Sequence, residues 1–248
     1  MTATCTHVTL LSSNAKLEKS KKLGGIVTAG LALAPHKRSG RNMCPGAGFC
    51  SRTCNLWFSG RCVTQSVRNA MLNRAYLLIR EPHEFRRQLE RELAALERKA
   101  AREGATAFVR LNVSSDLDFS DVAVRFPGIR FYDYTKVRSR VERMISGNWP
   151  ANYWLTPSYH ERLHWNTVRR YLRHGLNVSV IFDTVYQPQA HRIGPLPESY
   201  RGVPVIDGDT HDLRVPEYDG CGVIVGLRFK GSRRPLGDAI RVGLVIAT

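Results

Sequence analysis

The stretch Gly24-Gly-Ile-Val-Thr-Ala-Gly-Leu-Ala-Leu-Ala34 decides how the fold is interpreted. It is mostly apolar, rich in small residues, and followed at once by Pro35, which ends a regular strand. A short apolar run bounded by turn residues is typical of a strand that is covered on both faces. The stretch therefore predicts the first core strand of an α/β fold.

Further β-prone runs follow this first strand. They cover Ala107–Val113, Ile129–Tyr134, Tyr153–Thr156, Val178–Phe182, Val203–Ile206, Val223–Phe229 and Val242–Ala247. Apolar residues recur at helical spacing over Val63–Ile79, from Phe85 up to Gly104, and over Tyr159–His174. Strands that alternate with helices predict βαβ units and a parallel sheet.

We therefore expect an α/β fold, a partial or irregular (β/α) barrel with parallel strands and a cysteine-rich loop after the first core strand. A doubly wound open sheet is the alternative. Residues 1–22 are polar, end in Lys19-Ser-Lys-Lys22, and are expected to form an N-terminal basic arm. Residues 23–248 then form a single barrel-like domain, because no low-complexity linker divides them.

Composition and charge restrict the class of protein. The chain has 248 residues, and its apolar content of 43% is ordinary for a globular protein. No apolar run approaches the roughly 20 residues of a membrane span, and no secretory leader is recognisable, so we expect no membrane association and a cytoplasmic location. The net charge of +16 favours a polyanionic partner, either nucleic acid or a phosphorylated substrate. A generally basic surface without a defined partner is the alternative.

Four of the six cysteines cluster in the segment Cys44-Pro-Gly-Ala-Gly-Phe-Cys50-Ser-Arg-Thr-Cys54 and the nearby Cys62. Gly46 and Gly48 can take backbone angles closed to other residues, which would let the loop turn its thiols inward. Convergent thiolates are the ligands of iron–sulfur clusters and of zinc. All four cysteines are thus candidate metal ligands, with disulfides or unligated thiols as the alternatives.

Polar side chains follow nearly every predicted strand. Parallel folds place their chemistry at the carboxyl ends of strands, so these residues should surround one site with the cysteine loop. The candidate catalytic residues are Asp116, Asp118, Tyr132, Asp133, Tyr134 and Lys136. The candidate cofactor-binding residues are Asn112, Ser114, Ser158 and Asp183. Helix capping is the alternative role for several of the serines and aspartates.

Four motifs in the chain resemble the bacteriophage family called "gene product 88". The resemblance covers roughly residues 14–185, and its most specific part is the cysteine stretch. The motifs are Asn14-Ala-Lys-Leu17, Cys44-Pro-Gly-Ala-Gly-Phe-Cys50 with Cys54, Ser115-Asp-Leu-Asp-Phe119, and Phe131-Tyr-Asp-Tyr-Thr-Lys136. The resemblance implies a phage origin and hence the cytoplasm of the infected host. It implies no particular reaction.

A more distant similarity is to radical S-adenosylmethionine enzymes. These hold a [4Fe–4S] cluster with three cysteines in the loop after the first strand of a partial (β/α) barrel, and one iron stays open for the cofactor. Cys44, Cys50 and Cys54 match that placement but not the usual spacing. If Cys62 also binds, the open iron is lost, and electron transfer, a structural role or zinc becomes the better explanation.

Two functional hypotheses follow. The first is a phage-encoded iron–sulfur enzyme with a [4Fe–4S] cluster, resembling the radical S-adenosylmethionine type. It would act on a nucleotide, a nucleic-acid-linked group or a phosphorylated substrate. The second is a basic nucleic-acid-binding or host-takeover protein whose zinc or iron–sulfur site is structural.

Overall fold

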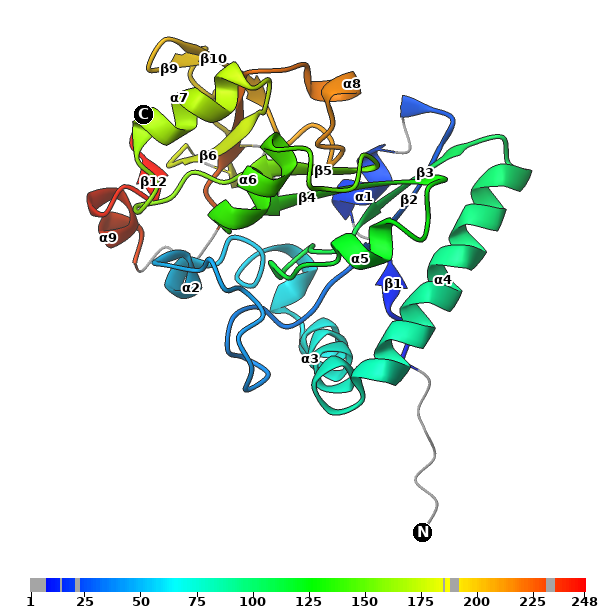
Figure 1. Cartoon of the computed structure of the whole chain (residues 1–248). Coiled ribbons are helices and arrows are strands. Elements are labelled where there is room, and N and C mark those ends of the chain that lie inside the picture. Colours follow the sequence, from blue (N-terminus) through cyan, green and yellow to red (C-terminus); the bar gives the residue numbers. More distant parts are fainter. Residues whose placement is uncertain (1–7, 14, 21–22, 185, 188–191, 231–234) are drawn as a thin grey trace.

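The structure is a computed structural model that describes residues 8–13, 15–20, 23–184, 186–187, 192–230 and 235–248 (Figure 1). Its larger helices are α3 (Gln65–Arg80), α4 (Pro82–Arg102), α6 (Arg138–Ile145) and α7 (Trp165–Arg173). The shorter ones are α1 (Ala15–Ser20), α2 (Cys50–Thr53), α5 (Ser120–Ala123), α8 (Pro216–Asp219), α9 (Leu236–Arg241) and the 3₁₀ turn η2 (Gly60–Val63).

The first sheet has the order β1-β2-β3-β4-β5. The short β1 runs antiparallel to β2, and every other pair is parallel. The bounds are β1 Leu11–Ser12, β2 Ile26–Leu31, β3 Thr106–Arg110, β4 Ile129–Thr135 and β5 Tyr153–Pro157. Because β2 to β5 are parallel, their carboxyl ends lie along one edge of the sheet.

The second sheet has the order β12-β6-β11-β10-β9 and is parallel except at β9. A parallel bridge from Ser158 to Ser179 links the two sheets. A separate antiparallel pair is formed by β7 and β8. The bounds are β6 Val178–Phe182, β7 Tyr186–Gln187, β8 Arg192–Ile193, β9 Ser199–Tyr200, β10 Val203–Asp207, β11 Ile224–Arg228 and β12 Val245–Ile246.

The prediction of an α/β fold with mostly parallel strands is confirmed, but a regular barrel is not. The strands form two five-stranded sheets, one of them curled into a half-barrel. After β6 the chain order breaks down, because β6 pairs with β11 and β12 instead of with the next strands along the chain. Between β6 and β10 the described residues form the short strands β7, β8 and β9, where a repeating βα unit would supply a helix.

Local patterns located most elements well. The predicted strand Val178–Phe182 is found with the same bounds, and the long helix after Pro82 ends before Gly104. The helix expected over Tyr159–His174 begins later, at Trp165. The Tyr159 N–H donates to the Ser179 carbonyl, and His164 caps the helix by accepting the Asn166 N–H. These contacts hold the segment before Trp165 outside the helix.

Residues of the predicted basic arm contact the first strand. Leu11 and Ser12 pair with Leu31 and Gly30 of β2, and Leu10 and Leu17 are fully buried. Residues 1–7, 14 and 21–22 of that arm lie outside the described residues. The division into an arm and a single domain over residues 23–248 stays a prediction.

The larger apolar core lies between the first sheet and the helix pair α3–α4 (Figure 1). Leu89 and Leu93 of α4 pack here with Val109 of β3 and Ile129 of β4, and all four are fully buried. A second core joins Val168 of α7 to the β6 strand. The two cores hold α3, α4 and α7 against the strands. The carboxyl ends of the strands are therefore available to form a site.

Shortening Leu93 tests the importance of the first core. Leu93→Ala removes a fully buried side chain and is expected to lower the free energy of unfolding by about 2–5 kcal/mol. Arg98→Ala, at an exposed position on the same helix, is the matched control and should change it by less than about 0.5 kcal/mol. Urea unfolding curves measure both values. Equal stability of the two variants would contradict this account of the core.

Candidate active site

A cavity of about 120 Å³ opens where the cysteine loop meets the carboxyl ends of β3, β4 and β5. Seven of the residues singled out in the sequence line it together: Cys44, Cys50, Asn112, Asp116, Tyr134, Lys136 and Ser158. Arg110, Ser115 and Thr135 complete most of the remaining wall. The fold therefore brings two cysteines and the polar ends of three strands to one place.

The cysteine loop approaches the end of β4 too closely for any side chain on its glycines. A Cβ atom on Gly46 would lie 2.7 Å from the Lys136 Cβ, and one on Gly48 would lie 1.8 Å from the Glu161 Oε1. Neither glycine has a positive φ angle, so the expectation that they are needed for unusual backbone angles was wrong. They are needed for close packing.

Backbone groups point at the sulfur atoms of two cysteines. The Cys44 Sγ accepts a hydrogen bond from the His36 N–H at 3.3 Å, and the Cys44 S–H donates to the Ser114 carbonyl at 3.5 Å. The Cys54 Sγ accepts from the Trp57 N–H at 3.4 Å. N–H donors aimed at sulfur stabilise a thiolate, and they also tune the potential of a bound iron–sulfur cluster.

Three of the thiols lie close enough to influence one another electrostatically. The pKa of Cys44 is raised to about 12, chiefly by burial, with negative charge on Cys54, Asp116 and Cys50 adding to the shift and the His36 N–H opposing it. Burial likewise raises the pKa of Cys54, with Cys50 adding to the shift. Positive charge, such as a metal ion or cluster would bring, is what reverses such shifts and favours the thiolates.

Cys62 is placed beside Cys54 and away from the cavity wall. Burial raises its pKa, the Cys54 charge adds to the shift, and the nearby Arg68 opposes it. The guanidiniums of Arg68 and Arg38 lie over the Trp57 ring, at 4.8 and 4.6 Å from its centroid. This pair of cations borders the Cys54 side of the loop.

The five cysteines in the described part of the chain are free thiols. Within the same part, no three His, Cys, Asp or Glu side chains converge closely enough to hold a single metal ion. The donor set of Cys44, Cys50 and Cys54 is chemically suited to a thiolate-bound cluster, because all three are soft ligands and two receive N–H hydrogen bonds.

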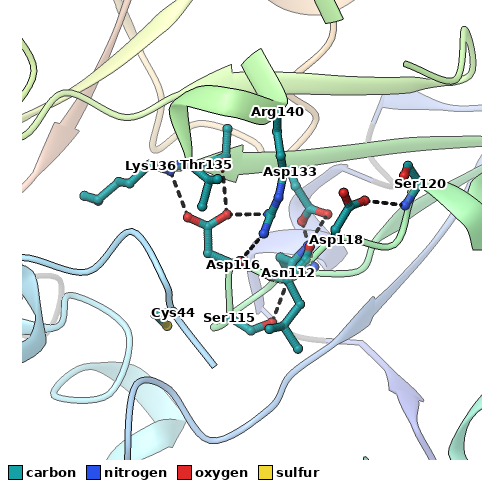
Figure 2. Close-up of polar contacts among 12 residues, drawn as sticks. Cys44, Asn112, Ser115, Asp116, Asp118, Ser120, Asp133, Thr135, Lys136 and Arg140 are labelled. Atoms are coloured by element: carbon teal, nitrogen blue, oxygen red, sulfur yellow. Dashed lines mark hydrogen bonds and ion pairs between the residues drawn. The ribbon is translucent and has the colours of Figure 1, made fainter. Parts of the chain in front are cut away.

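Asp116 ties the loop to the strands (Figure 2). Its carboxylate accepts hydrogen bonds from the Thr135 hydroxyl, the Lys136 N–H and the Arg140 Nη1, at 2.8, 2.9 and 2.8 Å. Its backbone N–H donates to the Met43 carbonyl at 2.8 Å. The side chains of Asp116 and Arg140 are both nearly buried, at 9% and 8% exposure. Asp116 therefore positions the cavity wall.

The chain can now be compared with known proteins. The model of the family described as "Gene product 88" matches residues 8–246. The chain belongs to this phage family. No curated protein matches the sequence, and no solved structure matches it either. The family match confirms the resemblance seen in the cysteine motif, whereas the more distant similarity to radical S-adenosylmethionine enzymes receives no support from the comparisons.

Within this family member, Asn112 and Asp133 form a buried polar pair beside the cavity (Figure 2). The Asp133 carboxylate accepts the Asn112 N–H at 2.8 Å, the Asn112 Nδ2 at 3.1 Å and the Tyr153 hydroxyl at 2.5 Å. The Asn112 Oδ1 accepts from the Ser115 hydroxyl and the Leu117 N–H. Burial nevertheless raises the pKa of Asp133 to about 7.

Arg110 is the main cavity residue that the sequence analysis missed. Its Nη1 donates to Asp212 at 3.0 Å, its Nε lies 3.8 Å from Asp133, and its guanidinium lies 4.8 Å from the centre of the Tyr134 ring. An arginine inside the apolar run Ala107–Val113 was the available signal, since a charge in a core strand needs buried partners. Arg140 belongs to the basic stretch of residues 138–143, whose composition indicates only an exposed basic surface.

The remaining candidates lie outside the cavity wall. Ser114 donates its hydroxyl to the Leu33 carbonyl at 2.6 Å and supports the loop from below. Tyr132 is fully buried against Asp212, and burial raises its pKa well above the usual value. Asp118 is paired with Arg143 on the surface, and Asp183 accepts the Thr248 N–H near the end of the chain.

Asp116 and Asp118 offer a matched comparison of a buried and an exposed ion pair. Asp116→Asn leaves the Arg140 guanidinium buried without its counter-charge and is expected to cost about 3 kcal/mol of folding free energy. Asp118→Asn removes a pair whose partners are 44% and 39% exposed, and should cost about 1 kcal/mol or less. Denaturant unfolding measures both. Similar losses would show that Asp116 is not a structural anchor.

Asp133 gives the folding stability a pH dependence. Its pKa rises from 3.8 to about 7 on folding, so the folded protein binds this proton more tightly than the unfolded chain does. The stabilisation is complete below about pH 4 and is lost as the pH rises to about 7. Asp133→Asn, which imitates the protonated form, should remove this fall in a series of urea unfolding curves. Parallel profiles for both proteins would show that the pKa is not raised.

Proposed function

We propose that this phage protein is an iron–sulfur enzyme whose [4Fe–4S] cluster is held by Cys44, Cys50 and Cys54. The observation that carries the proposal is the shared cavity, where Cys44 and Cys50 face the polar carboxyl ends of three parallel strands. A purely structural metal would not need a cavity lined by arginine, lysine, tyrosine and asparagine side chains. Carboxyl ends of parallel strands are where α/β enzymes act.

The arrangement of the thiols supports a cluster over a single zinc ion. Zinc draws each sulfur to about 2.3 Å from one point, so its ligands must converge tightly. In the described residues the thiols are close enough to shift one another's pKa, yet no three of them converge on one ion position. A four-iron cluster lies between its ligands and spaces them more widely, which suits this loop.

Ligation by three cysteines is supported by the position of Cys62. Its electrostatic neighbour among the cysteines is Cys54 alone, whereas Cys44 is coupled to both Cys50 and Cys54. A cluster on three cysteines keeps one iron open to a cofactor or substrate. With S-adenosylmethionine as that cofactor, a cluster held by these three cysteines would supply radical chemistry.

The chain's own residues would bind and orient the ligand. The Lys136 ammonium lines the cavity and has no ion pair with a carboxylate in the part of the chain that the structure describes, so it can hold an anionic group. Burial raises the pKa of Tyr134 to about 12, which keeps its hydroxyl protonated as a hydrogen-bond donor. Asp116 accepts the Lys136 N–H and so fixes the backbone that carries the Lys136 side chain. The reducing cytoplasm of the infected host is the compartment that suits such a site.

Anaerobic purification followed by iron, sulfide and zinc analysis tests the proposal. We expect about four irons per chain. Cys44→Ser, Cys50→Ser and Cys54→Ser should each lose most of the iron, whereas Cys62→Ser should retain it. Cys221→Ser, which replaces an exposed thiol far from the loop in sequence, is the control for handling losses.

Three outcomes would count against parts of the proposal. One zinc per chain instead of iron would overturn it. Iron loss in Cys62→Ser equal to that in Cys54→Ser would show four-cysteine ligation and remove the open iron. A reconstituted, reduced protein that neither binds S-adenosylmethionine nor releases 5′-deoxyadenosine would exclude the radical reaction while leaving the cluster in place.

A further inference from the structure

A second and larger cavity adjoins the first. It has a volume of about 350 Å³, and we call it the basic groove. Lys136 lines both cavities, and Pro45 and Gly46 of the cysteine loop form part of the groove wall. The other lining residues are Val137, Arg138, His160, Arg162, Leu163, His164 and Thr167. A ligand in the groove would therefore lie against the cysteine loop and next to the cavity that Cys44 and Cys50 line.

The charge of the groove has one sign. Its lining contains one lysine, two arginines and two histidines, and no aspartate or glutamate. Arg138 pairs with Glu142 at 3.2 Å. Arg162 donates to the Gly46 carbonyl at 2.9 Å, and its Nε lies 3.9 Å from the Glu161 carboxylate, outside the groove lining. The side chains of Arg138 and Arg162 are 69% and 58% exposed, and contacts of this kind are weak in water. Both guanidiniums can therefore turn towards an anion in the groove.

Two helices begin at this groove. Helix α6 starts at Arg138, and no side chain caps its first turn. Helix α7 starts at Trp165, and its N-cap His164 and its third residue Thr167 both line the groove. The first turn of a helix presents unpaired N–H groups and the positive end of the helix dipole. At α7 the His164 side chain already accepts the Asn166 N–H, so the uncapped start is that of α6. This start and the positive dipole end of α7, together with the basic side chains, make the groove suited to phosphate.

His160 reports the positive potential in the groove. The pKa of its imidazole is lowered to about 4, first by burial and then by the charge of Lys136. Glu161 opposes the shift, but its carboxylate accepts the Phe49 N–H on the cysteine loop and is not part of the groove wall. The imidazole is therefore neutral at neutral pH, and a bound anion would raise its pKa.

We propose that the basic groove binds a phosphate group of the substrate, with the reacting end of that substrate extending into the cysteine cavity. The assignment of a reacting end rests on the proposed iron–sulfur function, whereas phosphate binding itself does not. The shared chemistry is a phosphate monoester or diester, and it comes either from a free nucleotide or from a nucleic acid. Lys136, at the junction of both cavities, contacts the phosphate nearest the reaction.

Binding of two probes to the full-length chain tests this assignment. The probes are inorganic pyrophosphate, followed by titration calorimetry at low salt, and a short 5′-phosphorylated single-stranded oligonucleotide, followed by fluorescence anisotropy. We expect Arg138→Gln and Arg162→Gln to weaken binding of at least one probe by about tenfold each. Both positions are exposed, so the variants should fold normally, and their melting temperatures check this.

Arg98→Gln on α4 is the matched control, because it removes one exposed arginine far from the groove. Its binding should equal that of the wild type. Binding of both pyrophosphate and oligonucleotide supports a nucleotide-sized phosphate site, and binding of the oligonucleotide alone supports a nucleic-acid substrate. Absence of binding, or an equal loss in Arg98→Gln and the groove variants, overturns the assignment.

The same titrations in Cys44→Ser separate the two proposals. If the iron is absent from the wild type but the groove variants still lose phosphate binding, the iron–sulfur function fails and the groove assignment stands. If the iron is present but phosphate binding does not depend on Arg138 and Arg162, the groove assignment fails alone. A rise in the His160 pKa on adding pyrophosphate, followed by NMR, should accompany binding in both wild type and Cys44→Ser.

Discussion

The buried carboxylate of Asp116 is the interaction on which the candidate site depends. It lies where the loop after β3, the end of β4 and the start of α6 meet, and it accepts hydrogen bonds from Thr135, Lys136 and Arg140. Its own backbone joins the cysteine loop through the Met43 carbonyl. A buried carboxylate must be compensated by fixed donors, and those donors hold four segments in one arrangement.

Three parts of the site surround the Asp116 carboxylate: the cysteine loop, the polar cavity wall and the basic groove. The cysteine loop packs on the end of β4 because Gly46 leaves room for the Lys136 backbone. In the cavity wall, Arg110 is held between Asp212 and Asp133, and the Asp133 carboxylate also accepts hydrogen bonds from Asn112 and Tyr153. In front, the basic groove opens towards solvent. Thiols, a rigid polar wall and a positive entrance are thus brought together by the ends of parallel strands.

Much of this arrangement follows from sequence patterns. Because the strands after the first core strand are parallel, residues that follow them were expected to meet, and Asn112, Asp116, Tyr134, Lys136 and Ser158 do line one cavity with Cys44 and Cys50. Asp118 and Asp183 also follow strands but turn to local partners, Arg143 and Thr248. A residue that directly follows a strand lies near the site. Whether its side chain lines the cavity depends on whether a nearer side chain or backbone group binds it first.

The sequence by itself determined the α/β class, the approximate bounds of the longer strands and of α3 and α4, the cysteine loop and the positive charge. These depend on the spacing of neighbouring residues and on composition. Only the tertiary structure decided that the strands after β6 pair out of chain order, that Arg110 and Arg140 are buried, and that the starts of α6 and α7 line one groove with Lys136. Those features depend on contacts between segments far apart in the chain. Such contacts cannot be inferred from the spacing of neighbouring residues.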